Sequence, residues 1–314
     1  MERAQKLSSG QKAIITVGAF VITFITICSF FKNDIKYIVK SKSIEKQYGN
    51  IQENGYFIDD NFDYVNDYTK TSVNSKSEIF DSIYYIVNSG LTHAKRYCGK
   101  NYKSCFDDMT SISNDEEALS LLNNYVHPYN SFDNITFNFD NDTIEITIKH
   151  TYSDKEIQTL NKIVNKVIKD NIKDNMTSRD KIKAIHDYII NNTDYDTLKT
   201  ENPKDTTYKS NTAYGVLVEG YGICSGYSDA MAIFLDKLNF INYKISNDQH
   251  IWNLVYLDNQ WLHLDLTWDD PVSDKNVTRD NYFLITTDTL RMLDDNVHYF
   301  NSDVFREANK KTTN

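Results

Sequence analysis

The sequence predicts an α+β fold in which a helix that begins with a cysteine packs on an antiparallel sheet. Cys224 stands between two glycines, and the apolar run that follows it is typical of a helix. Segments 249–257 and 260–271 are rich in aromatic and apolar residues, as strands are, and Asp258-Asn259 between them is typical of a two-residue hairpin turn. With 314 residues, 40% of them hydrophobic, the chain can form a packed core in one or two domains.

Cys224 has the sequence context of a nucleophile. At the first turn of a helix its sulfur meets the positive end of the helix dipole, which favours the reactive thiolate. The glycines on either side let the backbone turn tightly and approach a ligand. A lone cysteine is also commonly a small buried apolar residue, so this prediction depends on a base elsewhere in the chain.

The predicted hairpin supplies such a base. A turn at 258–259 pairs Leu257 with Gln260, which places His250 and Asp265 on one face as diagonal neighbours. Diagonal neighbours are roughly 7 Å apart at the backbone, within reach of a hydrogen bond between an imidazole and a carboxylate. Leu262, Leu264 and Leu266 then point the other way, into a core, whereas His263 shares the face of Asp265 and is a weaker alternative base.

Cysteine, histidine and aspartate together form a thiol triad. The imidazole takes the thiol proton, and the carboxylate fixes the imidazole tautomer and stabilises the imidazolium. We therefore predict Cys224 as the nucleophile, His250 as the base and Asp265 as the orienting carboxylate.

Three motifs carry a resemblance to a known family. They are Ala213–Tyr227, His250–Asn253 and Trp261–Pro271. In this order and spacing they resemble the transglutaminase-like superfamily, and within it the bacterial, membrane-anchored members with a papain-like core. The resemblance runs from about residue 177 to about residue 287.

The resemblance implies a transglutaminase-like fold and the same three roles for Cys224, His250 and Asp265. Ile251 departs from the pattern, because a small residue is expected after the histidine; it narrows the site. The resemblance also identifies Tyr195-Asp196 with a recurrent pair of the family. It implies no cofactor, and calcium regulation has no support in the residues.

Aromatic residues surround the predicted nucleophile. We predict Tyr214 as a hydroxyl donor that helps the Cys224 N–H to stabilise an oxyanion, with aromatic packing as the alternative. Tyr227, Trp252 and Trp268 are predicted to line the cleft. Asp269 and Asp270 lie at a loop end or in a cation site, and His186 is expected to be a packed or surface residue; we predict no metal ligands.

Residues 13–31 form an apolar run without a charge. Nineteen helical residues span about 28 Å, close to the hydrocarbon thickness of a bilayer. We expect an uncleaved transmembrane anchor, because no signal-peptidase pattern follows it; a cleaved signal peptide or a lipoprotein at Cys28 is the alternative. The positive residues of 1–12 keep that segment in the cytoplasm, which places the rest of the chain outside the cell.

The remaining chain divides into four predicted parts. Residues 32–75 are a spacer that opens with a helix from 33 to 49, and residues 76–150 are a small α+β unit with a hairpin turn at 141–142. Residues 151–290 are the catalytic domain, opened by capping boxes at Ser153–Glu156 and Thr177–Asp180. Residues 291–314 are a polar C-terminal tail.

Cys98 and Cys105 flank a short loop. Outside the cell such a pair is expected to form a disulfide, with free thiols or a metal site as the alternatives. This pairing leaves Cys28 and Cys224 unpaired, and an unpaired cysteine in an exported domain indicates reactivity.

The charge of the chain narrows its partners. A formal net charge of −10 argues against nucleic-acid binding, which requires basic surfaces. We expect a membrane-tethered enzyme that acts on peptide or amide bonds of cell-surface proteins or cell-wall peptides through a thioester. The triad serves hydrolysis and transamidation alike. The alternatives are an inactive peptide-binding module and a structural assembly protein.

Overall fold

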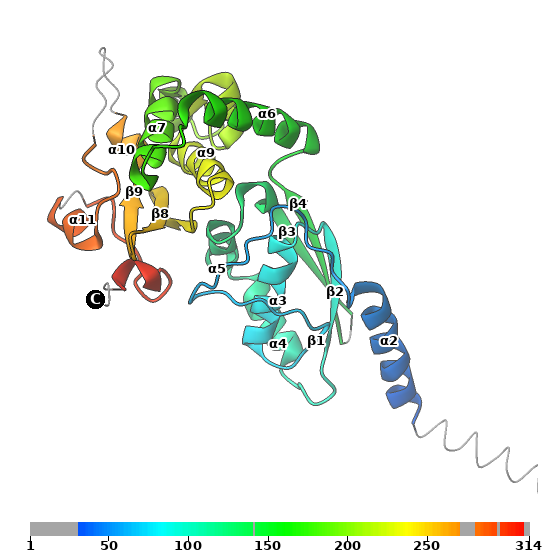
Figure 1. The fold of residues 1–314 in the computed structure, drawn as a ribbon. Coiled ribbons are helices and arrows are strands. Elements are labelled where there is room, and N and C mark those ends of the chain that lie inside the picture. The colour runs from blue at the N-terminus through cyan, green and yellow to red at the C-terminus, as the bar shows by residue number, and fades with distance from the viewer. Residues whose placement is uncertain (1–30, 141, 271–279, 294–295, 311–314) are drawn as a thin grey trace, which may run out of the picture.

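The structure, a computed structural model, describes residues 31–140, 142–270, 280–293 and 296–310. Residues 1–12 and the predicted anchor at 13–31 lie outside the described residues, except for Phe31. No helix within the described ranges is long and apolar enough to cross a membrane. The first helix, α2 (Lys32–Tyr48), confirms the helix predicted from residue 33 to 49. It lies at the end of the molecule far from the catalytic part (Figure 1).

The N-terminal unit is built on a four-stranded sheet in the order β1-β2-β4-β3. Its strands are β1 (Ser72–Val73), β2 (His93–Cys98), β3 (Phe132–Asp140) and β4 (Thr143–His150). Asp140 pairs with Thr143, which confirms the hairpin predicted at 141–142. Ile144, Ile146 and Ile148 of β4 are buried, so one face of this strand forms core.

Helices cover this sheet in the N-terminal unit. They are α3 (Lys76–Asn88), α4 (Cys105–Ser113) and α5 (Glu116–Leu121), with short 3-10 turns at Leu122–Asn124 and Pro128–Asn130. The sequence Ser113–Glu116 has the pattern of a capping box, but no capping box forms there. Asp115 caps α5 instead, because its side chain accepts the N–H of Ala118 at 3.0 Å.

Residues 50–71, part of the predicted spacer, are irregular but folded onto the body of the protein. Phe62 and Val65 are 4% and 3% exposed, and both belong to a large apolar cluster. The Phe62 ring is tilted against Tyr125 and edge-on to Tyr243, at ring-centroid distances of 5.5 and 5.1 Å. This stretch therefore packs between the N-terminal unit and the first strand of the catalytic sheet.

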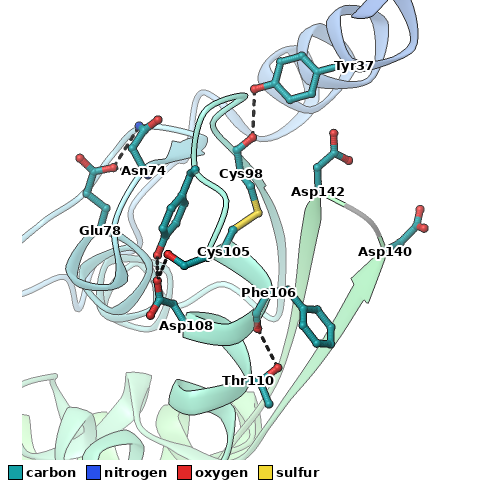
Figure 2. The surroundings of a disulfide bond; sticks show 12 residues. Tyr37, Asn74, Glu78, Cys98, Cys105, Phe106, Asp108, Thr110, Asp140 and Asp142 are labelled. Atoms are coloured by element: carbon teal, nitrogen blue, oxygen red, sulfur yellow. Dashed lines mark hydrogen bonds between the residues drawn. A yellow bond between two sulfur atoms is a disulfide. The ribbon is translucent and has the colours of Figure 1, made fainter. Parts of the chain in front are cut away.

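The predicted disulfide between Cys98 and Cys105 is confirmed. It joins the end of β2 to the first residue of α4 (Figure 2). The Tyr37 hydroxyl of α2 donates to the carbonyl of Cys98 at 3.0 Å, so the same corner also holds α2 on the sheet.

The predicted catalytic domain contains helices and a small antiparallel sheet. The helices are α6 (Asp154–Asn171), α7 (Ser178–Asn191), α8 (Thr197–Glu201), a π-helical turn at Gly215–Glu219, α9 (Cys224–Lys237), α10 (Leu266–Asp269) and α11 (Thr287–Leu293). Helices α6, α7 and α9 pack on one face of the sheet, and Leu290 of α11 is buried in the apolar cluster of the other face. Both predicted capping boxes form, at the N-termini of α6 and α7. Figure 1 shows α9 between α7 and the strands β8 and β9.

The catalytic sheet has the order β7-β8-β9, with strands Asn242–Ser246, Ile251–Leu257 and Gln260–Leu264. Asp258 and Asn259 adopt φ of 52° and 61°, and Leu257 pairs with Gln260 as predicted. The second predicted strand ends at Leu264 rather than at 271, since Asp265 caps α10.

The apolar and aromatic residues of Tyr282–Thr286 predict one more strand, but this segment forms none. Among the described residues this segment contributes one bridge, between Ile285 and His263. Leu284 has φ of 51°, a left-handed conformation that no regular strand contains. A short two-residue pairing does form elsewhere, between β5 (Asp194–Tyr195) and β6 (Tyr221–Gly222).

The C-terminal segment, predicted as a polar tail, is folded from residue 296 to 310. Val304, Phe305 and Ala308 are buried against the main apolar cluster, and a 3-10 turn spans Arg306–Asn309. The same cluster contains the core of the N-terminal unit and Trp252 of β8. The N-terminal unit, the catalytic sheet and the C-terminal segment therefore share one core.

Candidate active site

Cys224 is the first residue of α9 and a free thiol, partly exposed. No side chain of the described chain caps this helix, whose N-cap residue is Ile223. The first N–H groups of a helix have no partner within the helix, so those of α9 are available to an anion next to the sulfur. The helix N-terminus therefore presents a thiol together with donors for an oxyanion.

Two glycines allow the chain to pack closely around Cys224. A Cβ at Gly226 would lie 2.2 Å from the carbonyl oxygen of Ser210, and the N–H of Ile223 donates to that oxygen at 2.9 Å. A Cβ at Gly222 would lie 2.6 Å from Val216. Both glycines make room for neighbouring protein atoms, in addition to the tight turn that the sequence predicts.

His250 and Asp265 meet directly. The Nε2 atom of His250 and Oδ2 of Asp265 are hydrogen-bonded, and the two side chains are 7% and 3% exposed. This bond leaves Nδ1 of the imidazole available, and Cys224 lines the same cavity as His250. The structure thus brings the three predicted triad residues to one site, with Asp265 bonded to His250 and Cys224 on the wall of the cavity that His250 also lines.

The other carboxylate oxygen of Asp265 caps helix α10. Oδ1 accepts the Thr267 N–H at 2.9 Å, the Thr267 hydroxyl at 2.6 Å and the Trp268 N–H at 3.2 Å. An N-cap carboxylate is held by short-range geometry that depends only on neighbouring residues. Asp265 therefore has one oxygen fixed by α10 and the other directed at His250.

The two pKa shifts of this pair favour an ion pair. Burial opposes the charged form of His250, but the Asp265 carboxylate, followed by Cys224, raises the pKa of His250 to about 10. Burial likewise opposes ionisation of Asp265, but the charges and hydrogen bonds of His250 and His298 hold its pKa well below the ordinary range. Imidazolium beside carboxylate is the arrangement that stabilises a neighbouring thiolate.

His263, the alternative base, is occupied elsewhere. Its Nδ1 accepts the Trp252 indole N–H at 3.0 Å, so its Nε2–H donates to the Thr287 hydroxyl at 3.0 Å. Burial first, and then the charges of His298 and Arg291, lower the pKa of His263 to about 3. His263 is therefore a neutral structural residue, and His250 is the base that the geometry supports.

Cys224 and His250 line one cavity of about 480 Å³. Residues of the N-terminal unit form another part of its wall, among them Asn123, Ser131 and Asp133. The lining is mainly amides and hydroxyls, and it includes the buried pair of Lys244 and Asp229, whose atoms Nζ and Oδ1 are 2.5 Å apart. Such a lining suits a polar substrate with many hydrogen-bonding groups.

The predicted cleft residues occupy different positions. Trp252 is 1% exposed and stacks behind His250, with ring centroids 5.6 Å apart. Trp268 lies edge-on to His250 at 6.5 Å. Tyr227 is 1% exposed, and its hydroxyl donates to Asp270 at 2.6 Å. Trp252 and Tyr227 therefore support the site from within the core instead of lining its cavity.

Tyr214, the predicted oxyanion donor, is not among the residues that line the cavity of Cys224. Its ring instead lies 5.3 Å below the Lys209 ammonium. Cys224 affects a different tyrosine, Tyr195. Burial, and then the charges of Cys224 and Asp265, raise the pKa of Tyr195 to about 12. Tyr195 pairs with Gly222 in β5–β6, two residues before the nucleophile.

The remaining acidic and histidine residues near the site have protein partners. His186 is fully buried, and its Nε2 lies 3.2 Å from Asp269 Oδ2. Two groups in the described residues lie close enough to share a cation: His250, Asp265 and His298, and His186, Asp187 and Asp280. In both groups hydrogen bonds between the side chains already account for the arrangement.

Comparison with known proteins agrees with this geometry. Residues 166–266 match the family model of the transglutaminase-like superfamily, and the matched segment contains Cys224, His250 and Asp265. This segment is similar to a transglutaminase-like core. A solved structure titled "Crystal structure of a TGase" is 19% identical, covers 47% of this chain and 47% of that chain, and has a TM-score of 0.34. No curated protein matches the chain.

The match covers about a third of the chain, and the mixed α+β structure fits a transglutaminase-like core over that part. Two structural contributions to the site come from residues outside the matched segment. One is the wall that the N-terminal unit adds to the cavity. The other is His298, which no feature of the sequence indicated and which lies beyond the matched residues.

Proposed function

We propose that this protein is a thiol acyl-transfer enzyme that cleaves or exchanges peptide or amide bonds through a thioester on Cys224. The observation that carries the proposal is the buried His250–Asp265 pair beside a free thiol at an uncapped helix N-terminus. This arrangement supplies a nucleophile, a base and oxyanion donors around one cavity.

In the proposed reaction the Cys224 sulfur attacks the carbonyl carbon of an amide and forms a C–S bond. Before the attack His250 holds the thiol proton at Nδ1, and it gives this proton to the leaving nitrogen as the C–N bond breaks. The N–H groups at the start of α9 stabilise the oxyanion. Water then yields a carboxylic acid, or an amine yields a new amide; in each case the thiol is regenerated.

We further propose that residues 13–31 tether the enzyme to the membrane and that the catalytic part acts outside the cytoplasm. The disulfide between Cys98 and Cys105 supports this location, because such bonds persist in oxidising compartments. Proteins of the cell surface or cell-wall peptides are then the substrates within reach. The polar lining of the cavity suits such chains.

Alkylation of Cys224 by iodoacetamide tests the chemistry without a known substrate. We expect rapid labelling that persists well below pH 8, and a decrease of about 100-fold or more in His250→Ala, since general bases typically contribute that much. Mass spectrometry of the Cys224 peptide separates this signal from Cys28. Slow labelling that is unchanged in His250→Ala contradicts the enzyme and favours a non-catalytic peptide-binding module.

A complementary experiment distinguishes cleavage from cross-linking. Cell-wall fragments and surface proteins are analysed by mass spectrometry from cells that carry the wild-type protein or Cys224→Ala. New free carboxyl termini that require Cys224 indicate hydrolysis, and new isopeptide masses indicate transamidation. Fragments that are identical in the two strains contradict an action on the cell surface.

A further inference from the structure

His298 joins the candidate triad from the C-terminal segment. Its Nε2 atom lies 2.8 Å from Oδ2 of Asp265, the same oxygen that bonds to His250. The His298 side chain is 2% exposed. A carboxylate oxygen has lone pairs for two such donors, so the two histidines share Oδ2 without displacing each other.

Aromatic rings hold the His298 imidazole in place. It stacks on Tyr282 at 4.7 Å with an interplanar angle of 23°, and it lies edge-on to Trp252 at 4.9 Å and to Trp268 at 5.1 Å. Rings packed on several sides leave an imidazole little freedom to turn away from its hydrogen-bond acceptor.

The backbone on both sides of His298 is fixed to the loop that carries His250. The Asn247 amide donates to the carbonyls of Val297 and Tyr299 at 2.6 and 2.7 Å. Its oxygen accepts the His250 N–H at 2.9 Å. One side chain therefore sets the positions of both histidines relative to each other.

We propose that His298 is a positioning residue, which holds Oδ2 of Asp265 so that the carboxylate stays ionised and aimed at His250. This inference rests on the proposed function, because it assigns His298 a part in the same triad. Oδ1 is fixed by Thr267 and Trp268, so a donor on Oδ2 removes the remaining rotation of the carboxylate. A second donor also disperses its charge, which keeps the shared proton on His250.

Two variants of matched size separate this role from simple packing. His298→Phe keeps an aromatic ring in the cage and removes the donor. His298→Gln loses the ring, but its amide nitrogen can occupy the position of Nε2 and donate to Asp265. The full-length protein is used in detergent with EDTA, so that a cation shared by the histidines does not contribute.

The readout is the rate of Cys224 alkylation by iodoacetamide as a function of pH, with thermal unfolding measured in parallel. We expect His298→Phe to slow alkylation below neutral pH about tenfold, the size of effect that one hydrogen bond to a charged group produces. His298→Gln should recover most of this loss. Alkylation in His298→Phe that equals or exceeds the wild-type rate, in protein that is folded, overturns the inference.

A spectroscopic measurement covers the case in which a variant unfolds. In the wild-type protein the proton between His250 and Asp265 should give a far-downfield proton resonance, which is absent from an unfolded chain. This resonance should shift in His298→Phe, because the second donor on Oδ2 is lost, and should stay near its wild-type position in His298→Gln. A resonance at the wild-type position in His298→Phe contradicts the inference.

The same data distinguish failure of this inference from failure of the proposed function. If wild-type alkylation does not depend on His250, the triad itself is wrong. If it depends on His250 but is the same in the wild type and both His298 variants, the triad stands and only the role of His298 is rejected.

Discussion

The two regions of this protein that contain described cysteines use them in opposite ways. In the N-terminal unit Cys98 and Cys105 are buried, at 4% and 3% exposed, and joined in a disulfide at the edge of the sheet. In the transglutaminase-like core Cys224 is free, partly exposed and next to a buried imidazole. The first region gains stability from its sulfur atoms, whereas the second keeps its sulfur available for reaction.

The two regions also differ in the partners of their buried charged side chains. The N-terminal unit buries Arg96 against the hydroxyl of Ser82, and burial lowers the pKa of that guanidinium to about 10. The catalytic region buries carboxylates in contact with cations or imidazoles, at Asp265, Asp229 and Asp269. Paired buried charges are expensive to desolvate, so their concentration around one thiol indicates a preorganised site.

The largest expected effect comes from breaking the central pair. Asp265→Asn keeps the size of the side chain but leaves the buried His250 and His298 without their carboxylate. We expect a loss of about 3–5 kcal/mol in the free energy of unfolding, measured by urea titration. The matched control is Asp170→Asn on exposed α6, where the ion pair with Lys166 is at the surface and no measurable change is expected.

The difference in the free energy of unfolding between wild type and Asp265→Asn depends on pH. The Asp265 pKa is lowered in the folded state. The contribution of Asp265 to stability is therefore present above its pKa in the unfolded chain, about 4, and is lost as the pH falls. The His250 pKa is raised to about 10, so its contribution is complete below about pH 6.5 and is lost as the pH rises through 10. A difference that grows between pH 6.5 and 10 contradicts the ion pair.

A smaller effect is expected from the disulfide. Its cysteines are 7 residues apart, and closing so short a loop stabilises a protein by about 2–3 kcal/mol. The double variant Cys98→Ala, Cys105→Ala should lower the free energy of unfolding by this amount. It should leave the alkylation rate of Cys224 within about twofold of wild type, because neither cysteine lines the cavity of Cys224 and distant sites act independently. A large drop in that rate shows that the two regions are coupled.

The smallest effects are expected from changing two tyrosines, Tyr195 and Tyr214. Tyr195→Phe removes a hydroxyl whose pKa is raised by burial and by the charge of Cys224, and we expect alkylation to slow about threefold, in keeping with one neutral polar group near the thiol. Tyr214→Phe should leave the rate unchanged. A loss of 100-fold or more in turnover on Tyr214→Phe alone instead restores Tyr214 as the oxyanion donor, since one such donor typically contributes that much.

Local patterns in the sequence predicted a large share of the fold. The turn Asp258-Asn259 predicted the pairing of Leu257 with Gln260, and this register brings His250 to Asp265 although β9 ends at Leu264. Prediction succeeded there because a two-residue turn fixes the alignment of both strands. It failed at 282–286, where apolar residues typical of a strand form only one bridge, because they pack beside His263 and α11.

Sequence alone predicted the approach of His250 to Asp265, the helix that begins at Cys224 and the cysteines that pair, because each depends on neighbouring residues or on one short hairpin. Only the tertiary structure decided that His298 shares Asp265 with His250 and that the N-terminal unit forms part of the cavity wall. Those contacts join segments far apart in the chain. Their geometry is set by the packing of a common core, which no local periodicity records.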